Sequence, residues 1–243
     1  MKRLIKLYLF NEINKINIIL VFLATLMCGM IFYLSIDKPM GNFEYLANYK
    51  MYLAEYKNNV SFYMVVINIA LISFLIANDC FTTEKYDILF IVNEGKNKIY
   101  AAKLGSHLLF LSLILIIEFL FYEIYPLLIY KDYKLSLADL LLMLAYLLNA
   151  IYLLCLGEIF INLFKSFLSA FLFFISAFGL KILSDVSEEM CKIISLFYPT
   201  ICVKKNHFFY YGYIYVLIET IILFVLGLVI YKNRKFNNSW YFV

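Results

Sequence analysis

The chain has 243 residues, of which 65% are hydrophobic and 16% are charged, and its net charge is +4. Soluble domains are typically about 45–50% apolar and about 25% charged, so this composition excludes a soluble globular enzyme and a disordered chain. The modest net charge also argues against a nucleic-acid partner. The sequence therefore predicts an integral membrane protein.

The first element, residues 1–16, places cationic side chains among apolar ones. This pattern predicts a short interfacial helix, with apolar stems towards the membrane and cations towards anionic lipid headgroups. The alternative is that the segment extends the first span by a few solvated turns.

Long apolar runs follow along the chain. A helix needs roughly 20 residues to cross a hydrocarbon core about 30 Å thick. The runs predict six transmembrane helices over about 17–36, 60–77, 104–125, 140–161, 167–183 and 211–231. Because these runs are continuously apolar and do not alternate, β-strands are not expected. The predicted fold class is all-α integral membrane, with a single domain over residues 1–243.

The loop before the last span is unusual. Residues 190–203 are mostly apolar and are interrupted by Pro199. This segment is too short to span and too apolar for an ordinary solvated loop, so it predicts a short re-entrant or interfacial helical loop.

The orientation follows from lysine and arginine, which are more numerous in the segments on the side of the N-terminus. Both termini are therefore expected in the cytoplasm, in a multi-pass protein of the cell membrane. Among the five cysteines, only Cys191 and Cys202 share one loop. A disulfide between them would require an oxidising outer face.

Side chains that could perform catalysis are not grouped in this sequence. His107 and His207 are predicted at opposite faces, so they do not form a zinc site. Ser106 and His107 are neighbours on one helix and point apart, so they do not form a nucleophile–base pair. The residues before and after Gly95 do not fit a phosphate-binding loop. The sequence therefore predicts no catalytic residue, metal site or cofactor in this chain.

Polar residues inside the spans are candidates for a substrate path. A carboxylate in hydrocarbon is costly, so each one is expected to face protein or a water-filled cavity. They could line a translocation path, or they could make hydrogen bonds between helices or carry a proton. Glu158, near the inner end of its span, is expected to reach water. The candidate path residues are Asn68, Glu118, Glu123 and Glu219.

The segment 78–103 joins the second and third spans. It begins with an acidic turn, passes through an apolar patch at 88–92 and a polar turn at Gly95, and ends in a basic amphipathic stretch. Such a segment can dock on a soluble partner, with the apolar residues in a groove and the charges around its rim. The alternative is a loop that only connects two spans.

With this segment the chain resembles the membrane subunits of type-2 ABC transporters, the export permeases. The inner-face helix of that family has an acidic residue, an apolar patch, a turn and a basic stretch, and the matching residues are Glu84, Leu89, Lys98, Ile99 and Lys103. The layout is also similar, with an amphipathic N-terminal helix, six spans and a kinked apolar loop before the last one. The turn departs from the family, because Asn93-Glu94-Gly95 stands where many relatives carry Pro and Ser.

The resemblance implies a subunit without its own hydrolytic site. It would pair with a second permease, either a copy or a paralogue, and soluble ABC ATPase subunits would supply ATP and Mg²⁺ chemistry. The implied cargo is a peptide, a lipid or a drug-like molecule. The residues implied in ATPase coupling are Glu84, Asp87, Ile88, Leu89, Phe90, Glu94, Lys98 and Lys103.

Two other classes of function stay open. A stand-alone channel or ion-coupled carrier would use the span carboxylates as proton or cation sites, and such carriers often have paired repeats or broken spans. A membrane immunity or scaffold protein would need no polar path. A soluble ATPase that purifies with the native chain would favour the exporter over both.

Overall fold

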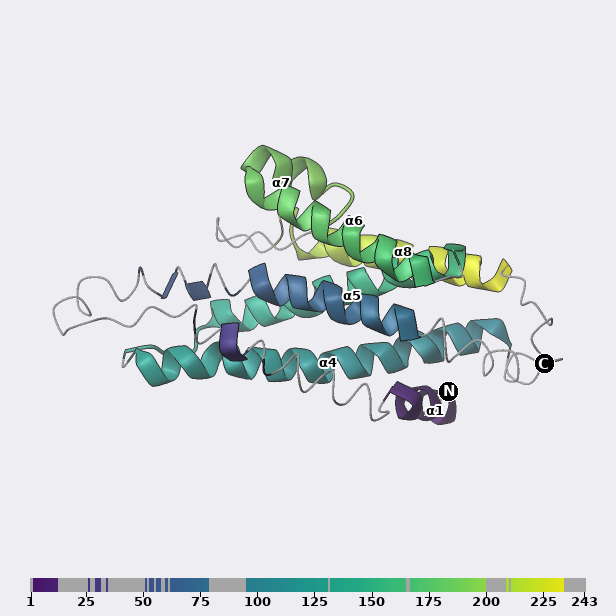
Figure 1. Ribbon diagram of the computed structural model, residues 1–243, viewed down its shortest axis with the longest axis horizontal. Helices are drawn as coiled ribbons and strands as arrows, with labels where there is room; N and C mark the ends of the chain where they lie inside the picture. Colours follow the sequence, from purple (N-terminus) through teal and green to yellow (C-terminus); the bar gives the residue numbers. More distant parts are fainter. Residues whose placement is uncertain are drawn as a thin grey trace.

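The computed structural model is all-helical, and Figure 1 shows how its helices are arranged. It describes residues 2–12, 26, 29–31, 34, 51, 53, 54, 56, 57, 60, 62–78, 95–130, 132–164, 167–199, 209 and 211–233. The main described helices are α1 (Lys2–Glu12), the helix Phe62–Asn78, α4 (Lys96–Ile129), α5 (Leu137–Phe164), α6 (Phe167–Val186), α7 (Glu188–Ile194) and α8 (Tyr213–Asn233). The predicted all-α fold class is confirmed.

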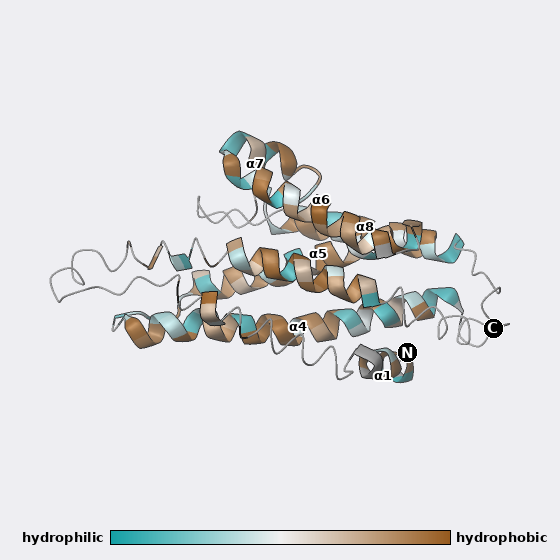
Figure 2. Cartoon of the chain, in the orientation of Figure 1, coloured by the Kyte–Doolittle hydropathy of each residue, from teal (hydrophilic) through white to brown (hydrophobic). Residues whose placement is uncertain are grey.

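Four of the described helices are long and apolar enough to cross a membrane, namely α4, α5, α6 and α8. Figure 2 shows hydrophobic residues along most of their length and hydrophilic residues at the start of α4 and the end of α8. The helix Phe62–Asn78 is apolar but shorter. Most of the predicted first span, 17–36, lies outside the described residues. The chain is therefore a membrane protein with four candidate spans among its described residues.

Four of the six predicted spans, 104–125, 140–161, 167–183 and 211–231, agree in position with α4, α5, α6 and α8, but their ends differ. The largest difference is in α4, which begins eight residues before the predicted span 104–125 and ends four residues after it. With 34 residues, α4 is about 51 Å long at 1.5 Å per residue, longer than a hydrocarbon core. Hydropathy identifies only the part of a helix that suits lipid, so the polar first turns of α4 were not included. Gly95, with φ of 79°, adopts the left-handed conformation that glycine tolerates and precedes the helix.

Helix α5 lies at the centre of the bundle, where it packs against α4, α6 and α8. Helix α4 also contacts α8, and α1 lies along the first part of α4, while α7 packs on α6 (Figure 1). The start of α4, the end of α8 and α1 share one end of the bundle, which we call the α1 end. The opposite end, where α6 is followed by α7, is the α7 end.

Two glycines allow close approach between helices. A Cβ atom at Gly157 of α5 would lie 2.1 Å from Cδ1 of Ile76, and one at Gly227 of α8 would lie 2.1 Å from the hydroxyl oxygen of Tyr100 on α4. Small residues at such crossings let membrane helices pack with their backbones close together. The bundle is therefore tightly packed in the half nearest to the α1 end.

Helix α1 has one face on the bundle and one face away from it. Leu4 and Tyr8, one turn apart, are buried, whereas Arg3, Lys6 and Leu7 are exposed. The contact with α4 includes Ile5, whose side chain lies next to Gly105. An amphipathic helix is therefore present within the predicted segment 1–16, and its cations point away from the bundle.

The segment after α6 contains a second short helix, α7, which overlaps the first part of the predicted loop 190–203. The Ser187 hydroxyl accepts a hydrogen bond of 3.2 Å from the Met190 N–H and caps α7, whose first turn carries Glu188 and Glu189. A turn over 195–198 follows, and Pro199 is buried. Residues 200–208 lie outside the described part of the chain.

Candidate functional site

The buried face of α4 carries polar side chains near both of its ends. Lys103 and His107 lie towards the α1 end, and Glu118 and Glu123 lie towards the α7 end, all with at most 5% of their surface exposed. The buried residues between His107 and Glu118 are apolar: Phe110, Leu111, Ile114 and Leu115. Along the helix axis this separation is roughly 16 Å at 1.5 Å per residue. The polar residues of α4 therefore form two groups with an apolar layer between them.

The group at the α7 end centres on Glu123. The Tyr133 hydroxyl, from the loop between α4 and α5, donates a hydrogen bond of 2.5 Å to Oε2 of Glu123. Burial, together with this hydrogen bond, raises the pKa of the Tyr133 hydroxyl, so that it remains a protonated donor. Lys57 lies over the Tyr133 ring, with 5.1 Å between its Nζ and the ring centroid.

Lys57 also forms an ion pair with Asp139 in the first turn of α5. The other oxygen of this carboxylate accepts two hydrogen bonds from Ser136, at 2.9 Å from its N–H and 2.7 Å from its hydroxyl. These contacts resemble a capping box, because an acidic residue in the first helical turn reaches back to the residue before the helix. The group thus joins the segment around Lys57, the α4–α5 loop and α5.

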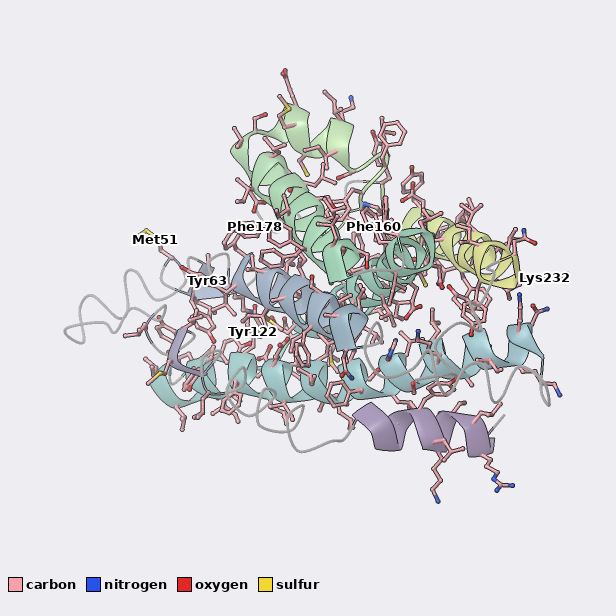
Figure 3. All side chains as sticks on the ribbon, turned by 45° about the vertical axis from the view of Figure 1, so that its right-hand side comes forward. Met51, Tyr63, Tyr122, Phe160, Phe178 and Lys232 are labelled. Carbon is pink, nitrogen blue, oxygen red and sulfur yellow. The ribbon has the colours of Figure 1, made fainter. Side chains whose placement is uncertain are left out.

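An aromatic cluster lies beside this polar group. The rings of Tyr56 and Tyr122 stack with centroids 5.7 Å apart, and the Tyr56 hydroxyl donates to the Tyr122 carbonyl at 3.0 Å. The ring of Phe119 lies 6.1 Å from that of Tyr122. Figure 3 shows Tyr122 between α4 and the helix Phe62–Asn78. Both tyrosine side chains are fully buried, so this end of the bundle is closed around Glu123.

The four predicted path residues are placed in different surroundings. Asn68, Glu118 and Glu123 are buried, as expected for polar groups that face protein in a membrane, whereas Glu219 is only partly buried. Glu219 interacts with the hydroxyl of Tyr215 on its own helix, and Glu123 interacts with Tyr133. Glu123 and Glu219 therefore belong to separate polar environments in this structure.

Six of the eight predicted coupling residues lie outside the described residues, namely Glu84, Asp87, Ile88, Leu89, Phe90 and Glu94. The two that are described lie in the first turns of α4 and differ in exposure. Lys98 is exposed, whereas only 1% of the Lys103 surface is exposed. In this structure Lys98 lies on the surface, and Lys103 is part of the bundle interior.

Lysines surround an open hollow at the α1 end. Its volume is about 670 Å³, and it is lined by Gly95, Lys96, Asn97, Lys98 and Lys232. The Lys96 ammonium donates a hydrogen bond of 2.9 Å to the Lys232 carbonyl at the end of α8. Figure 3 shows Lys232 above the start of α4. This end of the bundle therefore has a basic surface.

Three side chains hold the turn after α7 on the bundle. Asn149 donates to the Pro199 carbonyl at 3.0 Å, and Tyr152 donates to the Phe197 carbonyl at 2.8 Å. The Tyr215 hydroxyl donates to the Leu196 carbonyl at 2.7 Å. With its carbonyls satisfied, the turn presents the Phe197 side chain outwards, 80% exposed. Cys191 in α7 is disulfide-bonded.

Sequence reasoning missed the most deeply buried ionisable pair among the described residues. His107 of α4 and Glu158 of α5 lie 3.1 Å apart, measured from Nδ1 to Oε1, and 1% of each side chain is exposed. The expectation that Glu158 reaches water was wrong, because α5 extends beyond the predicted span and keeps this residue inside the bundle. The pairing depends on the register of two antiparallel helices, which spacing along one helix does not reveal.

The Lys57–Asp139 contact was also missed, because its members are 82 positions apart and come from separate elements. Ser136 and Asp139 did carry a signal, because Ser or Thr followed three residues later by an acid is typical of a helix start. The described residues contain no group of three or more His, Cys, Asp or Glu side chains that could hold a metal ion. The chemistry of the site is therefore that of paired charges and hydrogen bonds within a membrane bundle.

No protein-family model, curated protein or solved structure matches this chain.

Proposed function

We propose that the chain is the membrane-spanning permease subunit of an ABC exporter, which moves a peptide, lipid or drug-like substrate with energy from separate ATPase subunits. The observation that carries the proposal is the position at which α4 begins, since the predicted coupling segment ends in the first turns of this helix. That segment leads into α4 at Lys96, at the end of the bundle where α1 and Lys232 also lie. An ATPase docked there would contact the element that carries the buried polar groups.

The proposed architecture has six transmembrane helices. Helices α4, α5, α6 and α8 supply four of them, the helix Phe62–Asn78 is the second span, and residues 17–36 are the first. Helix α1 is the interfacial helix, and α7 with its turn is the kinked loop before the last span. This is the layout of the export permeases that the sequence resembles.

The proposed orientation places the α1 end in the cytoplasm, with both termini there, and the α7 end outside. Two features of the structure support it independently. Lysines line the hollow at the α1 end, and cytoplasmic segments of membrane proteins are enriched in lysine and arginine. At the opposite end Cys191 is disulfide-bonded, and disulfides persist in oxidising compartments.

The two polar groups of α4 fit a transporter that opens at one end at a time. In this arrangement the apolar layer of Phe110, Leu111, Ile114 and Leu115 closes the path, and the aromatic cluster at Tyr56 and Tyr122 closes the α7 end. Movement of α4 against α5 would open the path. We assign Asn68, Glu118, Glu123 and Glu219 to this path. Glu123 and Glu219 lie in separate polar environments.

Copurification tests this function. The full chain, tagged and expressed in its native cells, is extracted in a mild detergent, and the proteins that accompany it are identified and quantified. We expect a soluble protein with a phosphate-binding loop, in stoichiometric amount, together with a second permease chain. Recovery of this chain alone, as monomer or homo-oligomer, would instead favour a channel, an ion-coupled carrier or a scaffold.

A further inference from the structure

The interface between α4 and α5 contains a histidine and a carboxylate to which the proposed function gives no role. Nδ1 of His107 lies 3.1 Å from Oε1 of Glu158, and both side chains are 1% exposed. Ionisable side chains inside membrane bundles are costly, so those that are kept there mark ion or substrate pathways by default. This pair lies in the half of the bundle nearest to the α1 end, away from Glu118 and Glu123.

Several titratable groups face this region. On α4 they are Tyr100 and Lys103, and on α5 Cys155, all nearly fully buried. Helix α8 contributes Tyr231, whose ring centroid lies 5.4 Å from that of Tyr100. On α1, Tyr8 is buried against the bundle. The helix Phe62–Asn78 has no charged residue in its sequence. Helix α6 carries a charged pair, Lys181 and Asp185, near its far end. Lys103 and Glu158 therefore bring one buried cation and one buried anion to this region.

Next to the pair, α5 packs closely on the helix Phe62–Asn78. Gly157, the neighbour of Glu158, approaches Ile76 so closely that an added Cβ would lie 2.1 Å from its Cδ1. A metal ion is not favoured, because no third His, Cys, Asp or Glu side chain completes a group within the described residues. A proton is the ligand that needs neither a cavity nor further ligands.

We infer that His107 and Glu158 form a proton-binding site between α4 and α5. One proton is transferred from a hydronium ion at the α1 end to the imidazole, so that an N–H bond forms, an O–H bond breaks and a water molecule is left. With the proton bound, an imidazolium faces the carboxylate and the two helices are joined by an ion pair. After its release, a neutral imidazole faces the carboxylate, and Lys103 is the cation that remains in the region.

The residues that lead to the site lie on one face of α4. Tyr100, Lys103 and His107 are spaced by three and four positions, so they are neighbours on the helix surface. All three are buried, and Gly95, less than two turns before Tyr100, is exposed. This face connects the basic surface at the α1 end with the proton site. The inference does not depend on ATPase coupling, because it concerns contacts within this chain.

Nitrogen NMR of histidine tests the inference directly, because the chain contains only two histidines. In the variant His207→Gln, His107 is the one imidazole. We expect the full chain, labelled with ¹⁵N-histidine in liposomes, to change from the protonated to the neutral imidazole signal between about pH 5 and 9. Glu158→Gln should lower the midpoint by about one pH unit or more, which is at least a tenfold change in proton affinity.

Glu189→Gln is the matched control, because Glu189 is an exposed acid on α7 and its loss should leave the midpoint unchanged. If His207→Gln does not insert, the two-histidine chain is compared with His107→Gln, and the signal lost is that of His107. A His107 signal that keeps one protonation state over the whole range would overturn the inference. A midpoint that Glu158→Gln does not move would overturn the pairing.

Discussion

The hydroxyl of Tyr133 donates a hydrogen bond of 2.5 Å to Oε2 of Glu123, and this bond joins the α4–α5 loop to α4. Within the described residues, the other oxygen of Glu123 has no hydrogen-bond partner. Tyr133 is therefore the donor on which this buried carboxyl depends, although Lys57 and Asp139 also act on it electrostatically. The same tyrosine ring lies under the Lys57 ammonium, so it supports the whole polar group at the α7 end.

Replacing Tyr133 by phenylalanine removes this donor and keeps the ring. We expect Tyr133→Phe to lower the free energy of unfolding by about 1–3 kcal/mol, because the Glu123 carboxyl loses its partner while it stays buried. Denaturant titration of the purified chain in mixed micelles measures the change. Tyr63→Phe is the control, since 38% of Tyr63 is exposed against 8% of Tyr133, so its hydroxyl is not enclosed in the bundle. Equal effects of the two substitutions would contradict the role of Tyr133.

Alkaline pH should act on the same residue. Burial is the largest cause that raises the pKa of Tyr133 above its ordinary value of about 10, and the hydrogen bond to Glu123 is the second. The folded state then holds this proton more tightly than the unfolded state does. The stabilisation is fully present below pH about 10 and is lost as the pH rises towards the folded-state pKa. The stability difference between the wild type and Tyr133→Phe should therefore narrow above pH 10.

Alanine substitutions at two glycines compare a closely packed helix crossing with a position where an added Cβ meets no atom. An alanine at Gly157 would overlap Ile76, so Gly157→Ala should destabilise the chain by about 1–3 kcal/mol. At Gly179 of α6 an added Cβ meets no atom within 4 Å, so Gly179→Ala should be neutral or stabilise by up to about 1 kcal/mol through helix propensity. Thermal unfolding in detergent compares the two. A stabilising Gly157→Ala would mean that α5 and the helix Phe62–Asn78 do not approach as closely as described.

The helices themselves could be predicted from the sequence, because continuous apolar runs of membrane length have few other ways to satisfy their backbone groups. The beginning of α4 could not be predicted, since residues 96–103 are helical but include three lysines and an asparagine. Three of the four polar path candidates, Glu118, Glu123 and Glu219, were selected because carboxylates are conspicuous in hydrocarbon, and Asn68 because it is a polar residue within a span. Their partners were not, because Tyr133, Lys57 and Asp139 come from separate elements, and His107 and Glu158 meet only through the register of α4 and α5.

The proposed orientation predicts which ends of the bundle a reagent can reach. In a background without free thiols, a cysteine in place of Asp132 should react with a membrane-impermeant maleimide added to sealed cells. One in place of Asn97 should not react until the cells are opened. Both positions are exposed, the first in the α4–α5 loop and the second in the first turn of α4, so accessibility is matched. The reverse pattern would place the α1 end outside and would remove the docking site from the cytoplasm.

The coupling segment gives the last prediction, which concerns residues outside the described part of the chain. The apolar patch 88–92 belongs to no predicted span, and burial of each large side chain against a partner would contribute about 1.5–3 kcal/mol. Replacing Leu89 and Phe90 by aspartate would bury unpaired carboxylates at that contact, so ATPase binding and transport-stimulated ATP hydrolysis should be lost. Membrane insertion should persist. The matched control is the double substitution Ile193→Asp and Phe197→Asp, at exposed apolar residues near the α7 end, which should leave the ATPase bound. A normal amount of bound ATPase with normal stimulated hydrolysis in the Leu89/Phe90 variant would show that this patch is not the docking site.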